Sequence, residues 1–241
     1  MFSTILKAKS SSSNLLLSKR STAIFTFQRF LSLKTLTTPN ENALKFQADQ
    51  QVLPASSDRS SYQITLLNQN QSPLAVTLFE NCHAIQSILI GGDFITITKD
   101  EFAHWNQVRP LAESIITSHL KSKEEVINLD YMSQGTKEDT TPMTEEEKEI
   151  TEEIEELIAT KIRPSIQEDG GDIVFLRYSQ GTVYVQLQGA CTSCSLSDDT
   201  LKSGILSMLN HYIEEVTDVV NLAEVEFMKF EQKMKVKRGG K

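Results

Sequence analysis

The chain has 241 residues, a length that suits two small domains better than one. Its hydrophobic content of 39% and charged content of 23% are ordinary for a globular protein, and its net charge of −8 argues against nucleic acid as a partner, because phosphate binding needs a basic surface. The 3 cysteines are too few for a disulfide framework, and no apolar run is long enough for membrane insertion.

The first 38 residues carry basic side chains and no acidic ones. Serine, threonine, leucine and phenylalanine fill much of the remainder, a composition typical of a mitochondrial transit peptide. A disordered basic tail is the alternative interpretation. We therefore predict that residues 1–38 are a transit peptide outside the fold, that the mature chain starts near residues 30 to 40, and that it resides in the mitochondrial matrix. The basic residues are Lys7, Lys9, Lys19, Arg20, Arg29 and Lys34.

Residues 39–121 are predicted to form a first α+β domain. Ser72 followed by Pro73 is a helix start, and Gly91-Gly92 between two runs rich in Ile and Thr predicts a β-hairpin. A second helix follows, with Val108, Leu111, Ile115 and Ile116 at helical spacing. The expected strand, helix, hairpin strands and second helix lie at 43–48, 72–80, 84–90 with 93–99, and 105–120.

Residues 122–143 show no sustained periodicity and are predicted to be a flexible linker. Thr144 with Glu147 three positions later is a capping box that starts the next helix. Pro164 is expected to kink this helix, because proline removes one hydrogen bond of the ladder. Its acidic outer face is interpreted as solvated surface, with a partner site as the alternative. The apolar face is marked by Ile150, Ile154, Leu157, Ile158, Ile162 and Ile166.

Residues 144–225 form the predicted second domain, with the order α-β-β-α-β. The glycines of "EDGGD" (168–172) supply the positive φ that ends the helix, and a hairpin follows at 172–188. A helix from about 201 to 212 and a strand at 216–221 complete the domain. Gly204 within that helix indicates either a close approach of another group or a core backbone contact. A basic tail, 226–241, ends the chain, whose class is α+β: two small α/β-sandwich-type domains joined by a flexible linker.

Two cysteines, Cys191 and Cys194, lie in the loop between the hairpin and the last helix. Ser195 and Asp198 resemble a capping pair, and a helix N-terminus near the two thiols favours thiolate, the form that binds metals. The pair could act as a redox dithiol, bind zinc or bind an iron–sulfur cluster.

A thioredoxin-like dithiol fits poorly, because the order around the pair is not β-α-β. Zinc and iron–sulfur sites both need four ligands, and the chain supplies a single C-x-x-C. His211 lies turns away on the helix, and Cys82 is interpreted as buried packing. Two chains related by a two-fold axis would supply four thiolates.

The stretch from "RPSIQEDGGD" through "GACTSCSLSDDTLKSGI" resembles the C-terminal NifU-like domain of Nfu-type iron–sulfur proteins. Through "TPNENALKF" (38–46), "SPLAVTLF" (72–79), "DFITITK" (93–99) and Trp105, the upstream domain resembles the N-terminal domain of mitochondrial Nfu proteins. The resemblance implies a carrier, not an enzyme, that binds a [4Fe–4S] cluster through Cys191 and Cys194 of two chains. It implies a homodimer on cluster binding, upstream cluster-assembly proteins as donors, and apo-proteins such as lipoyl synthase and respiratory-chain subunits as acceptors. It also implies an N-terminal domain that assists partner recognition and holds no cluster. A thiol–disulfide oxidoreductase and a zinc-bridged structural dimer remain as alternatives.

Overall fold

The computed structural model describes residues 31–128, 144–192 and 198–222, which all belong to one compact unit, Leu31–Lys241. We call residues 31–128 the first lobe, and residues 144–192 with 198–222 the second lobe. The predicted transit segment up to residue 30, the linker from 129 to 143, Cys194 with Ser195, and the basic tail lie outside the described residues. Within the described part of the chain, no helix combines the length and apolar character needed to cross a membrane.

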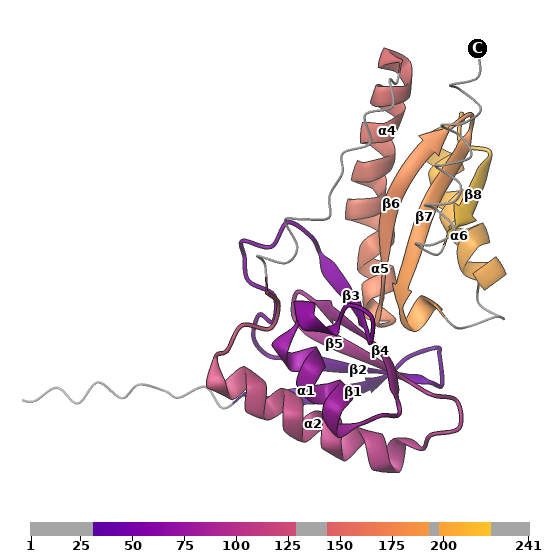
Figure 1. Cartoon of the computed structure of the whole chain (residues 1–241). Coiled ribbons are helices and arrows are strands. Elements are labelled where there is room, and N and C mark those ends of the chain that lie inside the picture. The colour runs from indigo at the N-terminus through magenta and orange to yellow at the C-terminus, as the bar shows by residue number, and fades with distance from the viewer. Residues whose placement is uncertain (1–30, 129–143, 193–197, 223–241) are drawn as a thin grey trace, which may run out of the picture. The chain divides into compact units, whose positions relative to one another are not determined.

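The first lobe is a five-stranded antiparallel sheet in the order β1-β2-β5-β4-β3, against which helices α1 and α2 pack (Figure 1). The predicted strand, hairpin and both helices are confirmed. The elements are β1 (Leu33–Thr37), β2 (Ala43–Ala48), β3 (Ser61–Thr65), the short helix η1 (Gln69–Gln71), α1 (Pro73–Asn81), β4 (Ile85–Gly91), β5 (Phe94–Lys99) and α2 (Trp105–Ser122).

The start of α1 follows from its sequence. The Ser72 hydroxyl accepts a hydrogen bond from the Ala75 amide at 3.1 Å, and Pro73 occupies the first turn, as predicted. The same hydroxyl donates to the carbonyl oxygen of Val126 at 2.6 Å. Val126 and Ile127, within the stretch assigned to the linker, are buried in the core of the first lobe.

Strand β1 lies inside the segment that the sequence assigned to the transit peptide. It pairs with β2 along its whole length, and Thr35 Oγ1 donates to Glu113 Oε1 of α2 at 2.5 Å. The exclusion of all 38 residues from the fold is therefore wrong for Leu33–Thr37. The composition of an edge strand such as LKTLT is hard to distinguish from that of a leader, because both are rich in Thr, Leu and Lys.

The buried face of α2 is rotated from the predicted one. Leu111 is 36% exposed and Ile115 is only partly buried, whereas Ala112 and Leu120 are buried. The true buried face runs in steps of four residues through Val108, Ala112, Ile116 and Leu120. The prediction missed Ala112 because a small side chain gives little signal in a hydrophobic pattern.

The second lobe has the predicted order α-β-β-α-β, so the α+β class is confirmed for both lobes. Strands β6 and β7 are antiparallel, and β8 pairs parallel to β7. The helical segment that precedes β6 and the helix that follows β7 both pack on this sheet and share one core with it (Figure 1). The elements are α4 (Glu145–Leu157), η2 (Ile158–Ile162), α5 (Arg163–Glu168), β6 (Gly171–Ser179), β7 (Thr182–Gly189), η3 (Ala190–Thr192), α6 (Asp198–Tyr212) and β8 (Asp218–Asn221).

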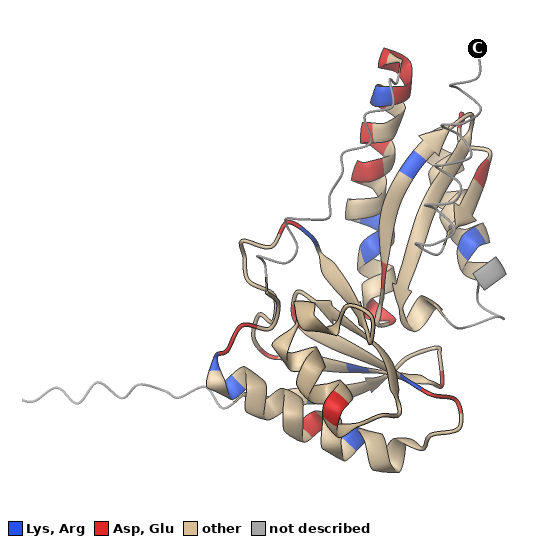
Figure 2. Ribbon diagram, viewed as in Figure 1, with Lys and Arg blue, Asp and Glu red and all other residues tan. Residues whose placement is uncertain are grey.

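Helix α4 begins at the predicted capping box. Thr144 Oγ1 accepts from the Glu147 amide at 3.1 Å, and Glu147 Oε2 accepts from the Thr144 amide at 3.0 Å. The predicted apolar face is buried or half-buried, and the glutamates of the opposite face are largely exposed. Figure 2 shows the acidic residues spaced along this helix. Exposure agrees with the solvated interpretation of that acidic face.

The helix does not end at Pro164. Residues Ile158–Ile162 form a π turn, and α5 then begins with Pro164 in its first turn. Proline is tolerated in a first turn, since the amide it lacks has no partner there. The interruption that the sequence suggested is therefore absorbed as a π turn, and Ile162 and Ile166 stay in the core.

Candidate metal centre

Cys191 lies in η3, directly after the end of β7. Along β7, Val183, Val185 and Leu187 are buried in the core of the second lobe, while the residues between them are half-buried. The alternation stops at the cysteine end, where Gln188 to Ala190 are all buried. Both faces of the hairpin are covered there, because the first lobe contacts the face that the helices leave open.

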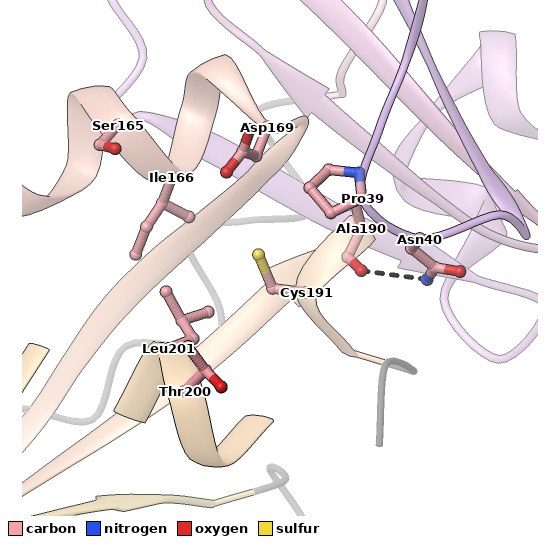
Figure 3. Close-up of a pocket in the computed structure, with 9 residues that line it drawn as sticks. All are labelled: Pro39, Asn40, Ser165, Ile166, Asp169, Ala190, Cys191, Thr200 and Leu201. Atoms are coloured by element: carbon pink, nitrogen blue, oxygen red, sulfur yellow. Dashed lines mark hydrogen bonds between the residues drawn. The ribbon is translucent and has the colours of Figure 1, made fainter. Parts of the chain in front are cut away.

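The backbone on each side of Cys191 is held by hydrogen bonds. The Ala190 amide donates to the Gly170 carbonyl at 3.2 Å, and Thr192 Oγ1 donates to the Gly189 carbonyl at 2.9 Å. The Ala190 carbonyl, which belongs to the peptide of Cys191, accepts from Asn40 Nδ2 at 3.0 Å (Figure 3). These bonds fix the direction in which the cysteine side chain leaves the chain.

Gly171 makes room for the sulfur. It pairs with Gly189 across the hairpin, and a Cβ atom at Gly171 would overlap Cys191 Sγ and approach the Gln188 carbonyl oxygen at 3.0 Å. The predicted positive φ is confirmed for Gly170, whose φ is 80°, whereas Gly171 is extended strand. The two adjacent glycines thus have different tasks, a turn for one and space for the other.

A pocket of about 200 Å³ opens beside Cys191, whose sulfur points toward it (Figure 3). Its walls come from the loop before β2, the end of α5, η3 and the start of α6. The lining is largely apolar around the sulfur, with polar groups from Ser165, Asp169 and Thr200. The described lining residues are Pro39, Asn40, Ser165, Ile166, Asp169, Ala190, Cys191, Thr200 and Leu201.

The other candidates from the sequence lie apart from this pocket or outside the description. Cys194 lies outside the described residues, so the structure does not test its pairing with Cys191 as a ligand set. Cys82 is buried in the core of the first lobe at the end of α1, as predicted for a packing residue. His211 is exposed in the last turn of α6, and its ring contacts that of Tyr212 edge-on.

Gly204 is exposed on α6, and no atom of the described residues lies within 4 Å of a Cβ built there. Of the two readings of this glycine, the core backbone contact is therefore not found among the described residues, and the approach of another group is not tested. Within residues 31–128, 144–192 and 198–222, no three His, Cys, Asp or Glu side chains are grouped closely enough to hold a metal ion.

Sequence reasoning missed the contribution of the first lobe to the pocket. Pro39 and Asn40 lie about 150 residues before Cys191. In its local sequence Asn40 resembles an ordinary turn residue, and its side-chain oxygen accepts a hydrogen bond from the Asn42 amide at 2.9 Å. A single sequence carries no signal for the second bond of this side chain, to Ala190.

Each of the two lobes matches a known protein family. Residues 33–123 match the family model described as the N-terminal part of the scaffold protein Nfu/NifU, and residues 154–220 match the NifU-like domain. The mitochondrial NifU-like protein of Saccharomyces cerevisiae is 44% identical over 216 residues, which cover 83% of each chain. A NifU-like protein of Schizosaccharomyces pombe is 40% identical, over 86% of this chain and 81% of its own.

A third relative is described as a mitochondrial NFU1 iron–sulfur cluster scaffold homolog, from Drosophila willistoni. It is 36% identical, over 87% of this chain and 72% of its own. The family model names a scaffold protein rather than an enzyme, and mitochondrial relatives of this similarity make the chain a mitochondrial protein. With both of its lobes matched and most of its length aligned, the chain belongs to the Nfu/NifU-like family of scaffold proteins.

Proposed function

We propose that this protein is an iron–sulfur cluster scaffold and carrier. It binds a [4Fe–4S] cluster between two chains through Cys191 and Cys194 of each, and transfers the cluster to mitochondrial apo-proteins such as lipoyl synthase and respiratory-chain subunits. The observation that carries the proposal is the sulfur of Cys191, directed toward a pocket at the first cysteine of a C-x-x-C pair.

The number of ligands favours a site shared by two chains. A cubane cluster takes four cysteine thiolates, and one C-x-x-C supplies two. Cys82 is a poor third ligand, because it is only 9% exposed and packs in the core of the other lobe. A two-fold axis next to the cysteine loop would bring a second identical pair and complete the set.

Transfer then proceeds by ligand exchange. A cysteine of the acceptor loses its proton to solvent, and its thiolate forms a new bond to a cluster iron. The bond from that iron to Cys191 or Cys194 breaks, and the released thiolate takes up a proton. Repetition moves the cluster with no change in its oxidation level, so neither a catalytic base nor a reductant is needed. Upstream cluster-assembly proteins would load the site by the reverse exchange.

Anaerobic reconstitution of the full chain with iron and sulfide tests the proposal. Visible absorption, iron and sulfide analysis, and size-exclusion chromatography with light scattering are recorded before and after loading. We expect four irons per two chains, and a dimer that becomes more populated with loading, because a ligand that binds only the dimer shifts the equilibrium toward it.

A full cluster on a monomeric chain would rule out the shared site. Loading with zinc in preference to iron, at one ion per two chains, would favour the zinc-bridged alternative. A stable Cys191–Cys194 disulfide that exchanges with substrate thiols and prevents loading would favour the oxidoreductase.

A further inference from the structure

The carboxylate of Asp172 is fully buried, and groups from three separate segments bond it. Ser60 Oγ donates at 2.7 Å and Ser61 Oγ donates to the same oxygen. Arg163 Nε at 3.2 Å and the Ile173 amide at 2.7 Å donate to the other oxygen. We call Asp172 with Ser60, Ser61 and Arg163 the Asp172 cluster.

The cluster joins the two lobes beside the cysteine loop. Ser60 and Ser61 belong to the first lobe at the start of β3, whereas Asp172 lies on β6, next to Gly171. A buried carboxylate is costly unless hydrogen bonds compensate for the water it loses. Here half of the compensation comes from the first lobe, so the contact between the lobes is specific.

Further bonds continue this contact to the cysteine. The Gly189 amide donates to Gln63 Oε1 at 2.8 Å, and Asn40 Nδ2 donates to the Ala190 carbonyl at 3.0 Å. Gly189, with a φ of 65°, approaches the first lobe so closely that a Cβ atom there would lie 2.5 Å from Leu89 Cδ2. The two residues that precede Cys191 are therefore held by the first lobe.

We propose that the first lobe is a functional part of the cysteine site: docked through the Asp172 cluster, Pro39 and Asn40 wall in the Cys191 sulfur, and undocking exposes it for reaction and cluster transfer. Asn40 is a positioning residue, since it acts on the peptide of Cys191. The role of the lobe in cluster transfer rests on the proposed function; its control of access to Cys191 does not.

The first arm of the test uses the apo full chain with Cys82→Ser and Cys194→Ser, so that Cys191 is its sole thiol. The rate of reaction with a small disulfide reagent is measured across pH in this background and with Ser60→Ala/Ser61→Ala added. The matched control is Ser57→Ala, because the Ser57 hydroxyl bonds Tyr62 OH at 2.9 Å and the Arg59 carbonyl at 3.0 Å, both within the first lobe.

Loss of the two donors to a charged acceptor should raise the reaction rate about tenfold at every pH, with the control unchanged. A uniform increase reports greater access to the sulfur and supports the proposal, whereas a displaced pH profile with an unchanged plateau rate would report a changed thiol pKa and would count against it. Equal rates in the double variant and the background, or an equal increase in the Ser57→Ala control, would overturn the proposal.

A second variant tests the positioning role of Asn40. Asn40→Asp keeps an acceptor for the Asn42 amide but sets a carboxylate oxygen against the Ala190 carbonyl, so the plateau rate at high pH should rise. Asn42→Asp is the control, because it adds the same charge where Lys99 Nζ bonds at 2.7 Å. The Gly189 amide is bonded to Gln63, and its hydrogen exchange should become faster in Asn40→Asp and in the double serine variant. Its exchange should stay unchanged in the two control variants. Unchanged exchange and rate in Asn40→Asp would remove Asn40 from the site.

The last arm uses the loaded chain. Cluster loss to an iron chelator should be several-fold faster in Ser60→Ala/Ser61→Ala than in Ser57→Ala, both with native cysteines. A chain that never loads would contradict the proposed function and leave the result on Cys191 access standing. A loaded chain with equal rates of loss would contradict the role of the first lobe in transfer.

Discussion

Cys82 and Cys191 both follow the end of a regular element, but their surroundings differ. Cys82 caps α1, its amide bonds the Leu78 carbonyl at 2.9 Å, and apolar side chains of the first core enclose it. Cys191 lies in η3, just after a strand whose end is fixed by polar bonds, and its sulfur points toward a pocket. The same residue type is buried among apolar side chains in one place and faces a pocket as a candidate ligand in the other, so the surroundings of the sulfur make the difference.

The largest expected effect comes from replacing the cysteines by alanine one at a time. Cys191→Ala or Cys194→Ala should abolish cluster loading, because each removes half of the thiolates that one chain supplies. Cys82→Ala should load fully and lose about 1 kcal/mol of unfolding free energy, the cost of a small buried group. Iron content after anaerobic reconstitution and urea unfolding measure the two outcomes. Failure of a folded Cys82→Ala protein to load would remove the contrast.

A second test changes the space beside the sulfur and leaves both cysteines in place. Gly171→Ala should displace Cys191 Sγ, so that loading falls several-fold and unfolding free energy drops by about 1 to 3 kcal/mol, as for other overpacked sites. The absorption spectrum and the rate of cluster loss are the measurements.

The control for that substitution is Gly204→Ala, since described atoms leave open space at Gly204. It should stabilise α6 by up to about 1 kcal/mol and leave loading unchanged. Impaired dimer formation in Gly204→Ala would instead show that a second chain approaches the helix there. Normal loading of Gly171→Ala would show that the sulfur has more freedom than the packing indicates.

The lobe that holds Cys82 should tolerate removal of N-terminal residues only up to β1. We expect processing at about residues 30 to 32, because a later cut would remove the strand that pairs with β2. A chain starting at Leu31 should be more stable than one starting at Thr38 by about 2 kcal/mol, with equal cluster loading. The mass of the mature protein and urea unfolding of the two chains test this. A mature N-terminus beyond Thr37 would contradict it.

The smallest effect concerns the attachment of β1 to α2. The hydrogen bond from Thr35 and then that from Arg109 hold the pKa of Glu113 below its usual value of 4.5. A carboxylate with a lowered pKa stabilises the fold above pH 4.5, and this stabilisation is lost as pH falls through the folded pKa. Thr35→Val should raise the Glu113 pKa toward 4.5 and flatten this acid dependence. A carboxyl titration followed by NMR measures it, and an unchanged pKa would show that Arg109 alone is responsible.

Much of the fold could be predicted from short-range sequence patterns. The Ser72 cap, the Thr144 capping box and the Gly91-Gly92 hairpin were readable because each depends on residues within a few positions. β1 was missed because its composition matches a leader. β3, a run of SYQIT, is short and has few apolar residues to mark it.

The cysteine pair was readable as a candidate site, and the resemblance pointed to the same residues. The contacts of the first lobe with that site were not readable, because Asn40 and Ala190 are 150 positions apart and Ser60 and Asp172 are 112 apart. Serine, asparagine and glutamine in loops or at strand starts have many possible partners, and their local pattern does not select one.

Those sequence separations bear on the order in which the molecule is built. The first lobe holds all of its sheet and core within residues 31–128, so it can fold while later residues are still being synthesised or imported. Asp172 and the cysteine loop arrive later, and contacts between distant segments form slowly, since a long loop must close first. We therefore expect a newly made chain to pass through a stage in which Ser60 and Ser61 are solvated and the cysteines are open to solvent. In this stage the chain would be most sensitive to oxidants, and docking of the lobes would mark the end of its maturation.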